Sequence, residues 1–233
     1  MMNGSLAAFE RDLEEQGIQV VWHEGRRGTA ADRCRVCVLG VLLTREGEAI
    51  ERYMLSRLTR AYRVVCIRQT APGALFEYPA LRYAQLYSIE HDEPVLYLHT
   101  KGAANPRPEQ RKIINMWLAE FVGAKQKYEA KIPEYDLLMP YSGPRNITWQ
   151  NGFIATPEAF SSIPPIEKSE NRFEYEILFR DSSLSSFGGR LDSIIRNDDT
   201  DNTALMFDDI EKFSSFIPDA FWLRVLHWIN PIK

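Results

Sequence analysis

Long apolar runs are missing from this sequence of 233 residues. The longest one covers residues 36–43 and is interrupted by Gly40, whereas a helix needs about 20 apolar residues to span a bilayer. The N-terminus also lacks a basic segment followed by an apolar one, which is the pattern of a secretory signal peptide. These absences predict a cytoplasmic protein without a transmembrane segment, and they are compatible with a peripheral contact to a membrane surface.

Cysteine is scarce, and neither sign of charge dominates. The three cysteines cannot all pair within one chain, so we expect free, mostly buried thiols in a reducing compartment. Cys34 and Cys37 have the spacing of a redox or zinc motif, but they lie in a strand-like stretch and no second pair completes four zinc ligands. The 28 basic and 32 acidic residues give a net charge of −4, which argues against a dedicated nucleic-acid binder.

Apolar periodicity predicts strands that alternate with helices. The expected helices cover residues 5–16, 45–60, 80–90, 108–130 and 171–180, with a short one from residue 157. The expected strands cover residues 33–43, 62–67, 95–98, 135–139 and 152–155, and a polar loop is expected over residues 23–32. This alternation is typical of an α/β fold with a mixed, mostly parallel sheet flanked by helices. We expect one domain over residues 1–190, with a helical and irregular extension over residues 191–233 packed on it.

The most informative segment follows the strand predicted over residues 95–98 and reads His99, Thr100, Lys101 and Gly102. Ligands of α/β sheets bind beyond the carboxyl ends of the strands. A lysine beside a histidine would suit an anionic phosphate group, and Gly102 would let the backbone turn or approach a ligand closely. If the strand continues to Lys101, His99 and Lys101 project to the same side. The alternative is a solvated turn lysine and an ordinary histidine at the strand end.

The segment of residues 101–131 is basic, with seven cationic residues against three glutamates. Attraction of phosphate is one interpretation, and it is strongest for Arg107 and Arg111, which follow the His99–Gly102 turn most closely. An ordinary solvated helix face is the alternative, and it is favoured for Lys125, Lys127 and Lys131.

Two motifs resemble a known family. The run Tyr97-Leu98-His99-Thr100-Lys101-Gly102, with Glu77-Tyr78-Pro79-Ala80-Leu81 upstream, is similar to bacterial glycosyltransferase-like proteins with a YLHTKG strand end and an EYPTL-type helix start. These proteins belong to the GT-A type of nucleotide-sugar transferase, and the resemblance covers roughly residues 9–180. It implies a GT-A-like, Rossmann-like sheet and transfer of a sugar from a nucleotide-sugar donor to a glycan or other hydroxyl acceptor in surface polysaccharide biosynthesis.

The resemblance also implies roles for individual residues. The residues expected to hold the donor and its phosphates are Glu77, Tyr78, His99, Thr100, Lys101, Gly102 and Arg107. The residues expected to hold the donor or acceptor sugar are Trp149, Asn151 and Gly152. An inverting transferase needs a carboxylate base for the acceptor hydroxyl, and Glu174 or Glu176 would fill that role, with Glu174 preferred. The alternative for these glutamates is a salt bridge with Arg172 or Arg180.

The expected strand end differs from that of many GT-A transferases, which hold manganese or magnesium there with an Asp-x-Asp motif. The corresponding triplet here is His99-Thr100-Lys101, so no residue is assigned as a metal ligand. The Lys101 ammonium could neutralise a diphosphate directly, while a role for a divalent metal stays open. The family also begins with a strand before its first helix, which we expect to be absent here because the sequence opens with the helix of residues 5–16. The alternative function is therefore a non-catalytic GT-A-like module that binds a sugar or a partner protein.

Overall fold

The computed structural model of the protein describes residues 4–25, 32–70, 75, 77–101, 103, 108–142, 148, 152–169, 172–175, 177–179 and 183–190. The chain divides into two units, residues 1–188 and 189–233, and the fold described below is that of the first. The predicted extension over residues 191–233 lies outside the described residues and stays a prediction.

Seven strands form one mixed sheet in the order β1-β3-β2-β4-β6-β5-β7. Their bounds are β1 Gln19–His23, β2 Val36–Leu42, β3 Arg63–Gln69, β4 Val95–His99, β5 Leu137–Ser142, β6 Phe153–Ala155 and β7 Ser186–Arg190. β2 pairs in parallel with both β3 and β4, whereas β6 runs antiparallel to β4 and to β5. Strands β2 to β5 therefore point the same way, and the predicted α/β class with a mostly parallel sheet is confirmed.

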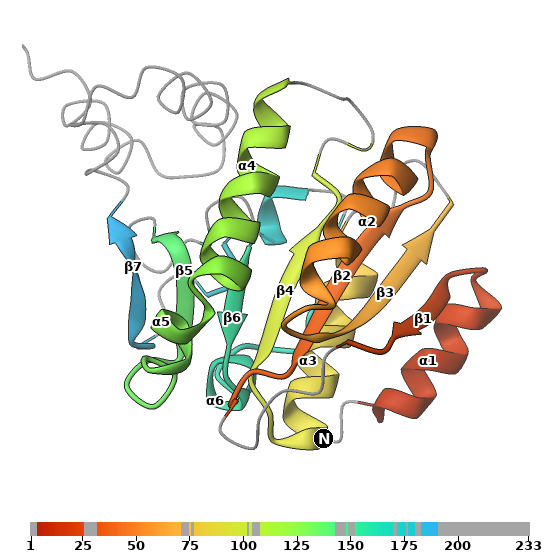
Figure 1. Ribbon diagram of the computed structural model, residues 1–233. Coiled ribbons are helices and arrows are strands. Elements are labelled where there is room, and N and C mark those ends of the chain that lie inside the picture. The colour runs from red at the N-terminus through yellow and green to blue at the C-terminus, as the bar shows by residue number, and fades with distance from the viewer. Residues whose placement is uncertain are drawn as a thin grey trace, which may run out of the picture. The chain divides into compact units, whose positions relative to one another are not determined.

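Helices cover both faces of this sheet (Figure 1). Their bounds are α1 Leu6–Glu15, α2 Arg45–Leu58, α3 Tyr78–His91, α4 Pro108–Leu118, α5 Lys125–Glu129 and α6 Pro157–Ser161. In the view of Figure 1, α2 and α4 lie in front of the sheet and α3 behind it. The strand residues that belong to the α3 side of the core include Val36, Val38, Val95 and Tyr97. The alternate residues of the same strands, such as Cys37 and Leu96, are equally buried, which explains the continuous apolar runs of the sequence.

Several predicted elements are confirmed together with the signals that predicted them. The hydroxyl of Ser5 caps α1 by accepting from the backbone N–H of Ala8, and Leu6, Phe9 and Leu13 form its buried face. The three cysteines are free and buried, as expected. No helix in the described part of the chain combines the length and the apolar character that crossing a membrane requires.

The structure corrects the prediction at both edges of the sheet. His23 was expected to open a loop, but it ends β1, which pairs antiparallel with β3. β7 was also not predicted, and it lies beside β5 at the other edge. Both are short edge strands with partly exposed side chains, so they lack the apolar run that marks the central strands.

The helix expected over residues 108–130 is interrupted. A π-helical turn, Ala119–Gly123, separates α4 from α5, and the Ala124 N–H donates to the carbonyl of Ala119 at 2.9 Å. The hydroxyl of Tyr62, which precedes β3, donates to the carbonyl of Phe121 inside this turn at 2.6 Å. The interruption thus coincides with a tertiary contact that the periodicity of the helix does not reveal.

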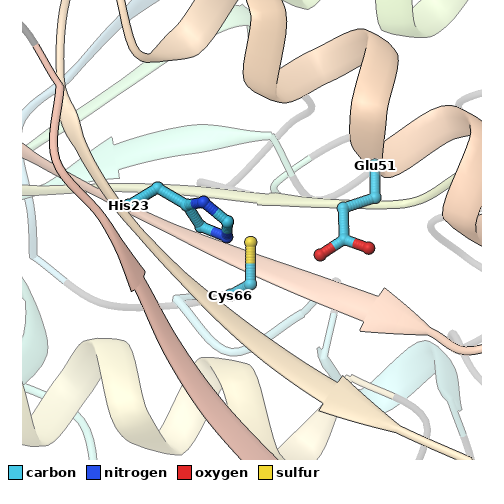
Figure 2. A group of neighbouring side chains, drawn as sticks. All are labelled: His23, Glu51 and Cys66. Atoms are coloured by element: carbon cyan, nitrogen blue, oxygen red, sulfur yellow. The ribbon is translucent and has the colours of Figure 1, made fainter.

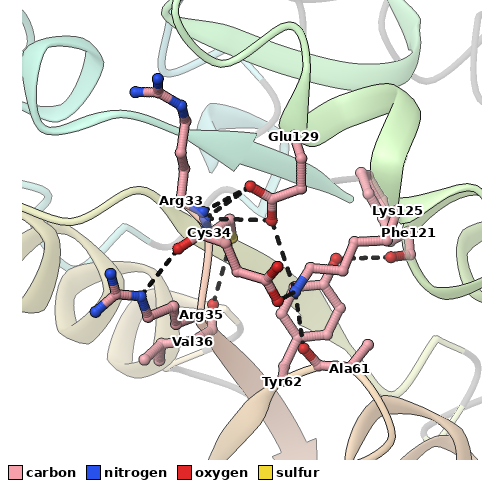
Figure 3. Close-up of polar contacts among 10 residues, drawn as sticks. Arg33, Cys34, Arg35, Val36, Ala61, Tyr62, Phe121, Lys125 and Glu129 are labelled. Atoms are coloured by element: carbon pink, nitrogen blue, oxygen red, sulfur yellow. Dashed lines mark hydrogen bonds and ion pairs between the residues drawn. The ribbon is translucent and has the colours of Figure 1, made fainter. Parts of the chain in front are cut away.

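A buried polar network fastens α5 to the start of β2 (Figure 3). The carboxylate of Glu129 accepts from the backbone N–H of Arg33 at 2.7 Å and of Cys34 at 3.3 Å. The Lys125 ammonium lies 2.8 Å from Asp32 Oδ2 and 3.6 Å from Glu129 Oε1. It also lies 4.6 Å from the centroid of the Tyr62 ring. Lys125 and Glu129 are thus structural residues at the amino-terminal edge of the sheet.

Candidate functional site

The carboxyl ends of β2 and β4 meet at the point where the direction of chain crossover reverses. From β2 the chain passes to β3 on one side and then returns to β4 on the other side of β2. Such a switch point is where open α/β sheets bind their ligands. His99 ends β4, and Thr100 and Lys101 follow it directly, so the structure brings these three residues of the main sequence motif to this position.

Hydrogen bonds fix the turn after β4 to the end of β2. The Thr100 N–H donates to the carbonyl of Gly40 at 2.8 Å, and the Thr100 hydroxyl accepts from the Leu42 N–H at 3.2 Å. The hydroxyl of Thr44, which caps α2, donates to the carbonyl of Ala103 at 2.9 Å. Thr100 is therefore buried, and both its N–H and its hydroxyl form hydrogen bonds with β2. The N-terminus of α2 lies at the same edge of the sheet as Thr100.

His99 forms an ion-pair contact with Glu77, the residue before α3. His99 Nε2 lies 3.5 Å from Glu77 Oε1, with the two side chains 12% and 19% exposed. Gly40 of β2 permits close packing of α3 and of His99 against this strand, since a Cβ there would lie 3.1 Å from Ala80 Cβ and 3.4 Å from His99 Cβ. The two motifs that carry the family resemblance thus meet in space, and the carboxylate of Glu77 orients the imidazole.

Aromatic rings surround the His99 imidazole. Trp117 of α4 packs edge-on against it at 5.4 Å between ring centroids, and Tyr97 lies at 6.2 Å. Burial raises the pKa of the Tyr97 hydroxyl well above its ordinary value, and Glu77 and Tyr175 add to the shift. Two buried hydrogen-bond donors, Tyr97 Oη and Trp117 Nε1, have no partner among the described residues.

Lys101 is buried, with 8% of its surface exposed. β4 ends at His99. The strand does not continue to Lys101, so the condition under which His99 and Lys101 would project to the same side is not met. Within the described ranges no carboxylate forms an ion pair with it. The interpretation of Lys101 as a solvated turn residue is therefore wrong, and the site contains a buried cation at the carboxyl edge of the sheet.

The other predicted site residues are placed as follows. Tyr78 packs edge-on against Phe9 of α1 at 6.1 Å, so its ring belongs to the packing between α1 and α3. Glu174 is exposed on a short 3₁₀ helix, Arg172–Tyr175, where an α-helix over residues 171–180 was expected. The predicted residues that lie outside the described residues are Gly102, Arg107, Trp149, Asn151 and Glu176.

Glu174 and its neighbour Tyr175 line a pocket of about 490 Å³ together with residues 163–169. Burial raises the pKa of the Tyr175 hydroxyl, and the carboxylate of Glu77 contributes to this shift. The role of Glu174 as a base stays a prediction.

Several described cations of the basic segment, residues 101–131, pair with nearby carboxylates. Lys127 pairs with Glu120 at 2.9 Å, and Lys131 pairs with Glu134 at 2.8 Å. Arg111, for which phosphate attraction was one interpretation, lies 3.3 Å from Glu46 Oε1 on the surface. Among the described side chains of this segment, Lys101 is the cation that lies buried at the switch point.

Gly152 has a packing role that the sequence did not reveal. A Cβ at this position would lie 2.2 Å from Trp117 Nε1, and Trp117 is fully buried. The glycine therefore makes room for the indole that packs against His99, while its predicted contact with a sugar stays a prediction.

Replacing Gly152 by alanine is expected to lower the free energy of unfolding by about 1–3 kcal/mol, because the indole must shift in a packed core. Urea denaturation of Gly152→Ala measures this change. Gly123→Ala is the matched control, since its Cβ would find only the Leu118 carbonyl oxygen at 4.0 Å and alanine is the better helix former. Equal stability of Gly152→Ala and wild type would contradict the packing role.

Trp117 and Gly40 were not predicted to be parts of the site. Trp117 stands four residues before Phe121, a spacing that indicates a core face. An isolated glycine inside a strand pattern indicates close approach of another group. Gly40 is such a glycine, so its contact with a neighbouring element could have been predicted.

Comparison of the chain with protein-family models, curated proteins and solved structures found no match.

Proposed function

We propose that the protein transfers a sugar from a nucleotide-sugar donor to a hydroxyl acceptor, with the donor bound at the carboxyl edge of β2 and β4. The observation that carries this proposal is the buried Lys101 at the switch point of the sheet, beside the His99–Glu77 pair. A buried ammonium without a described ion-pair partner is suited to an anionic ligand. The resemblance of the two motifs to GT-A-type transferases supplies the class of donor.

In this proposal, charge stabilisation, positioning and proton transfer fall to different residues of the chain. The Lys101 ammonium neutralises charge that develops on the diphosphate as the bond to the anomeric carbon breaks. Glu77 holds the His99 imidazole in place at the site. A carboxylate takes the proton of the acceptor hydroxyl as the new glycosidic bond forms, and Glu174, which lines a pocket with residues 163–169, is the described candidate.

We expect UDP- or GDP-linked sugars to raise the melting temperature of the wild-type protein, because a ligand that binds only the folded state stabilises it. A thermal-shift screen with and without manganese measures this. Stabilisation without manganese supports the donor site built on Lys101. Stabilisation only with manganese contradicts a site in which lysine replaces the metal, and the absence of any stabilisation at millimolar donor contradicts the proposal.

The second function is a non-catalytic module that binds a sugar or a partner protein. The exposed position of Glu174, the described candidate base, favours this alternative. Release of nucleoside diphosphate from a bound donor separates the two functions. An enzyme releases it in the presence of acceptor or slowly to water, whereas a binding module retains the intact donor.

A further inference from the structure

Three side chains that can bind a metal ion meet between the β1 edge of the sheet and α2. His23 is the last residue of β1, Cys66 lies in β3, and Glu51 lies in α2. One ligand atom from each residue lies within 4.8 Å of the other two. Figure 2 shows the Cys66 sulfur between the His23 imidazole and the Glu51 carboxylate.

The surroundings of His23 add a second observation. Its Nε2 atom is buried and has no hydrogen-bond partner among the described residues. A buried polar atom without a partner costs about 1–3 kcal/mol, so such atoms are rare in folded proteins. Glu51 is also buried, with 5% of its surface exposed, and Cys66 is fully buried.

We propose that His23, Glu51 and Cys66 bind a zinc ion. Imidazole, thiolate and carboxylate are the three ligand types that zinc takes in proteins, and a soft thiolate disfavours magnesium and calcium. Zinc bonds of about 2.0–2.3 Å in tetrahedral geometry require ligand atoms roughly 3.3–3.8 Å apart. The three ligand atoms lie within 4.8 Å of one another, so they would have to move about 1 Å closer together. Rotation of the side chains can provide this movement. Three protein ligands leave the fourth position to water.

Arg68 is compatible with this site although it carries positive charge. Its Nε lies 3.1 Å from Glu51 Oε1, which leaves the second carboxylate oxygen for the metal. Carboxylates that bind metals are commonly held by such an outer partner. Arg68 would thus hold the Glu51 carboxylate in position for the zinc ion, and it would not take the place of the ion as the positive charge of the site.

Binding of zinc requires the thiolate of Cys66. Burial, followed by the carboxylate of Glu51, raises the pKa of the Cys66 thiol above its ordinary value. The thiol therefore carries its proton at neutral pH, and zinc binding forms the Zn–S bond as this proton passes to solvent.

The zinc site is separate from the proposed donor site and does not depend on it. β1 is an edge strand and stands three places from β4 in the sheet. A metal ion held by β1, β3 and α2 would fasten the edge strand to the core. We therefore expect zinc to raise the melting temperature of the protein without any nucleotide sugar.

The test uses the full chain without a polyhistidine tag, loaded with zinc chloride and then dialysed against metal-free buffer. Elemental analysis is expected to find one zinc ion per chain in the wild type. Cys66→Ala is expected to bind zinc at least ~100-fold more weakly, since even outer partners of metal ligands contribute 10–100-fold. Cys34→Ala removes a buried thiol outside the cluster and is expected to retain the metal.

Cobalt(II) reports on the ligands of the folded wild-type chain directly. We expect a thiolate-to-cobalt charge-transfer band and the intense visible absorption of a tetrahedral site, both present in Cys34→Ala and absent in Cys66→Ala. Wild-type protein with a native circular dichroism spectrum but no retained zinc would overturn the proposal. A cobalt spectrum without the thiolate band, or zinc binding unchanged in Cys66→Ala, would overturn it as well.

Discussion

Replacement of Glu129 by alanine is expected to lower the free energy of unfolding by about 2–4 kcal/mol, because two backbone N–H groups lose the acceptor that they share. The carboxylate accepts from the backbone N–H groups of Arg33 and Cys34 and lies 3.6 Å from the Lys125 ammonium. Alanine leaves the buried N–H of Cys34 and the partly buried N–H of Arg33 without this acceptor, and the loss at a fully buried group is worth about 1–3 kcal/mol. Lys125 keeps its closer partner, Asp32 at 2.8 Å. Equilibrium denaturation in urea measures the difference.

Glu134→Ala is the matched control. Glu134 also pairs with a lysine, Lys131 at 2.8 Å, but its side chain is 55% exposed, and exposed pairs contribute about 0–1 kcal/mol. Glu129→Gln is expected to fall between the two because the amide keeps one acceptor oxygen. A destabilisation by Glu129→Ala no larger than that by Glu134→Ala would show that the network of Figure 3 contributes little.

Replacement of Lys101 by methionine is expected to reduce the proposed sugar transfer by about 10²–10³-fold, the effect of removing one preorganised group that stabilises developing negative charge. Methionine keeps the apolar stem and removes the ammonium, so the comparison isolates the charge. Because Lys101 is buried and has no ion-pair partner in the described parts of the chain, its removal leaves no carboxylate unpaired. We therefore expect the variant to be at least as stable as the wild type, while the thermal shift caused by the donor disappears.

Lys127→Met provides the comparison for this variant. Lys127 is exposed and pairs with Glu120, so its loss should leave donor binding unchanged. Undiminished donor binding by Lys101→Met would remove the main support for a phosphate site at this turn. Loss of donor binding in both variants would indicate a general electrostatic effect of the basic segment.

The central part of the fold could be predicted because its signals are local. β2 and β4 are continuous apolar runs, and α1 has a capping serine and an apolar face of helical period. β1 gave no such signal, since the segment Gln19–His23 is an edge strand whose side chains are only partly buried. Its pairing with β3 is a long-range contact that no local pattern encodes.

The candidate site was predictable to the extent that it lies in two short motifs. Glu77 and His99 were both named from the sequence, but their 3.5 Å contact follows from the crossover of α3 behind β2 and β4. Trp117 was interpreted as a core residue, and only the structure places it against His99. The His23, Glu51 and Cys66 cluster could not be predicted, because its members come from three different elements with no motif spacing.

The antiparallel placement of β1 has a consequence for folding during synthesis. The parallel unit β3-β2-β4 comes from one continuous stretch, residues 36–99, and can pair as that stretch leaves the ribosome. α1 and β1 are made earlier, and the ladder partner of β1 is complete when Arg68 has emerged. β1 therefore pairs over a shorter sequence separation than β2 and β4, which join Val36 to Val95, and it can close its ladder before β4 is made. The apolar face of α1 packs against α3, so this face stays exposed to chaperones and to other nascent chains until residues 78–91 have emerged.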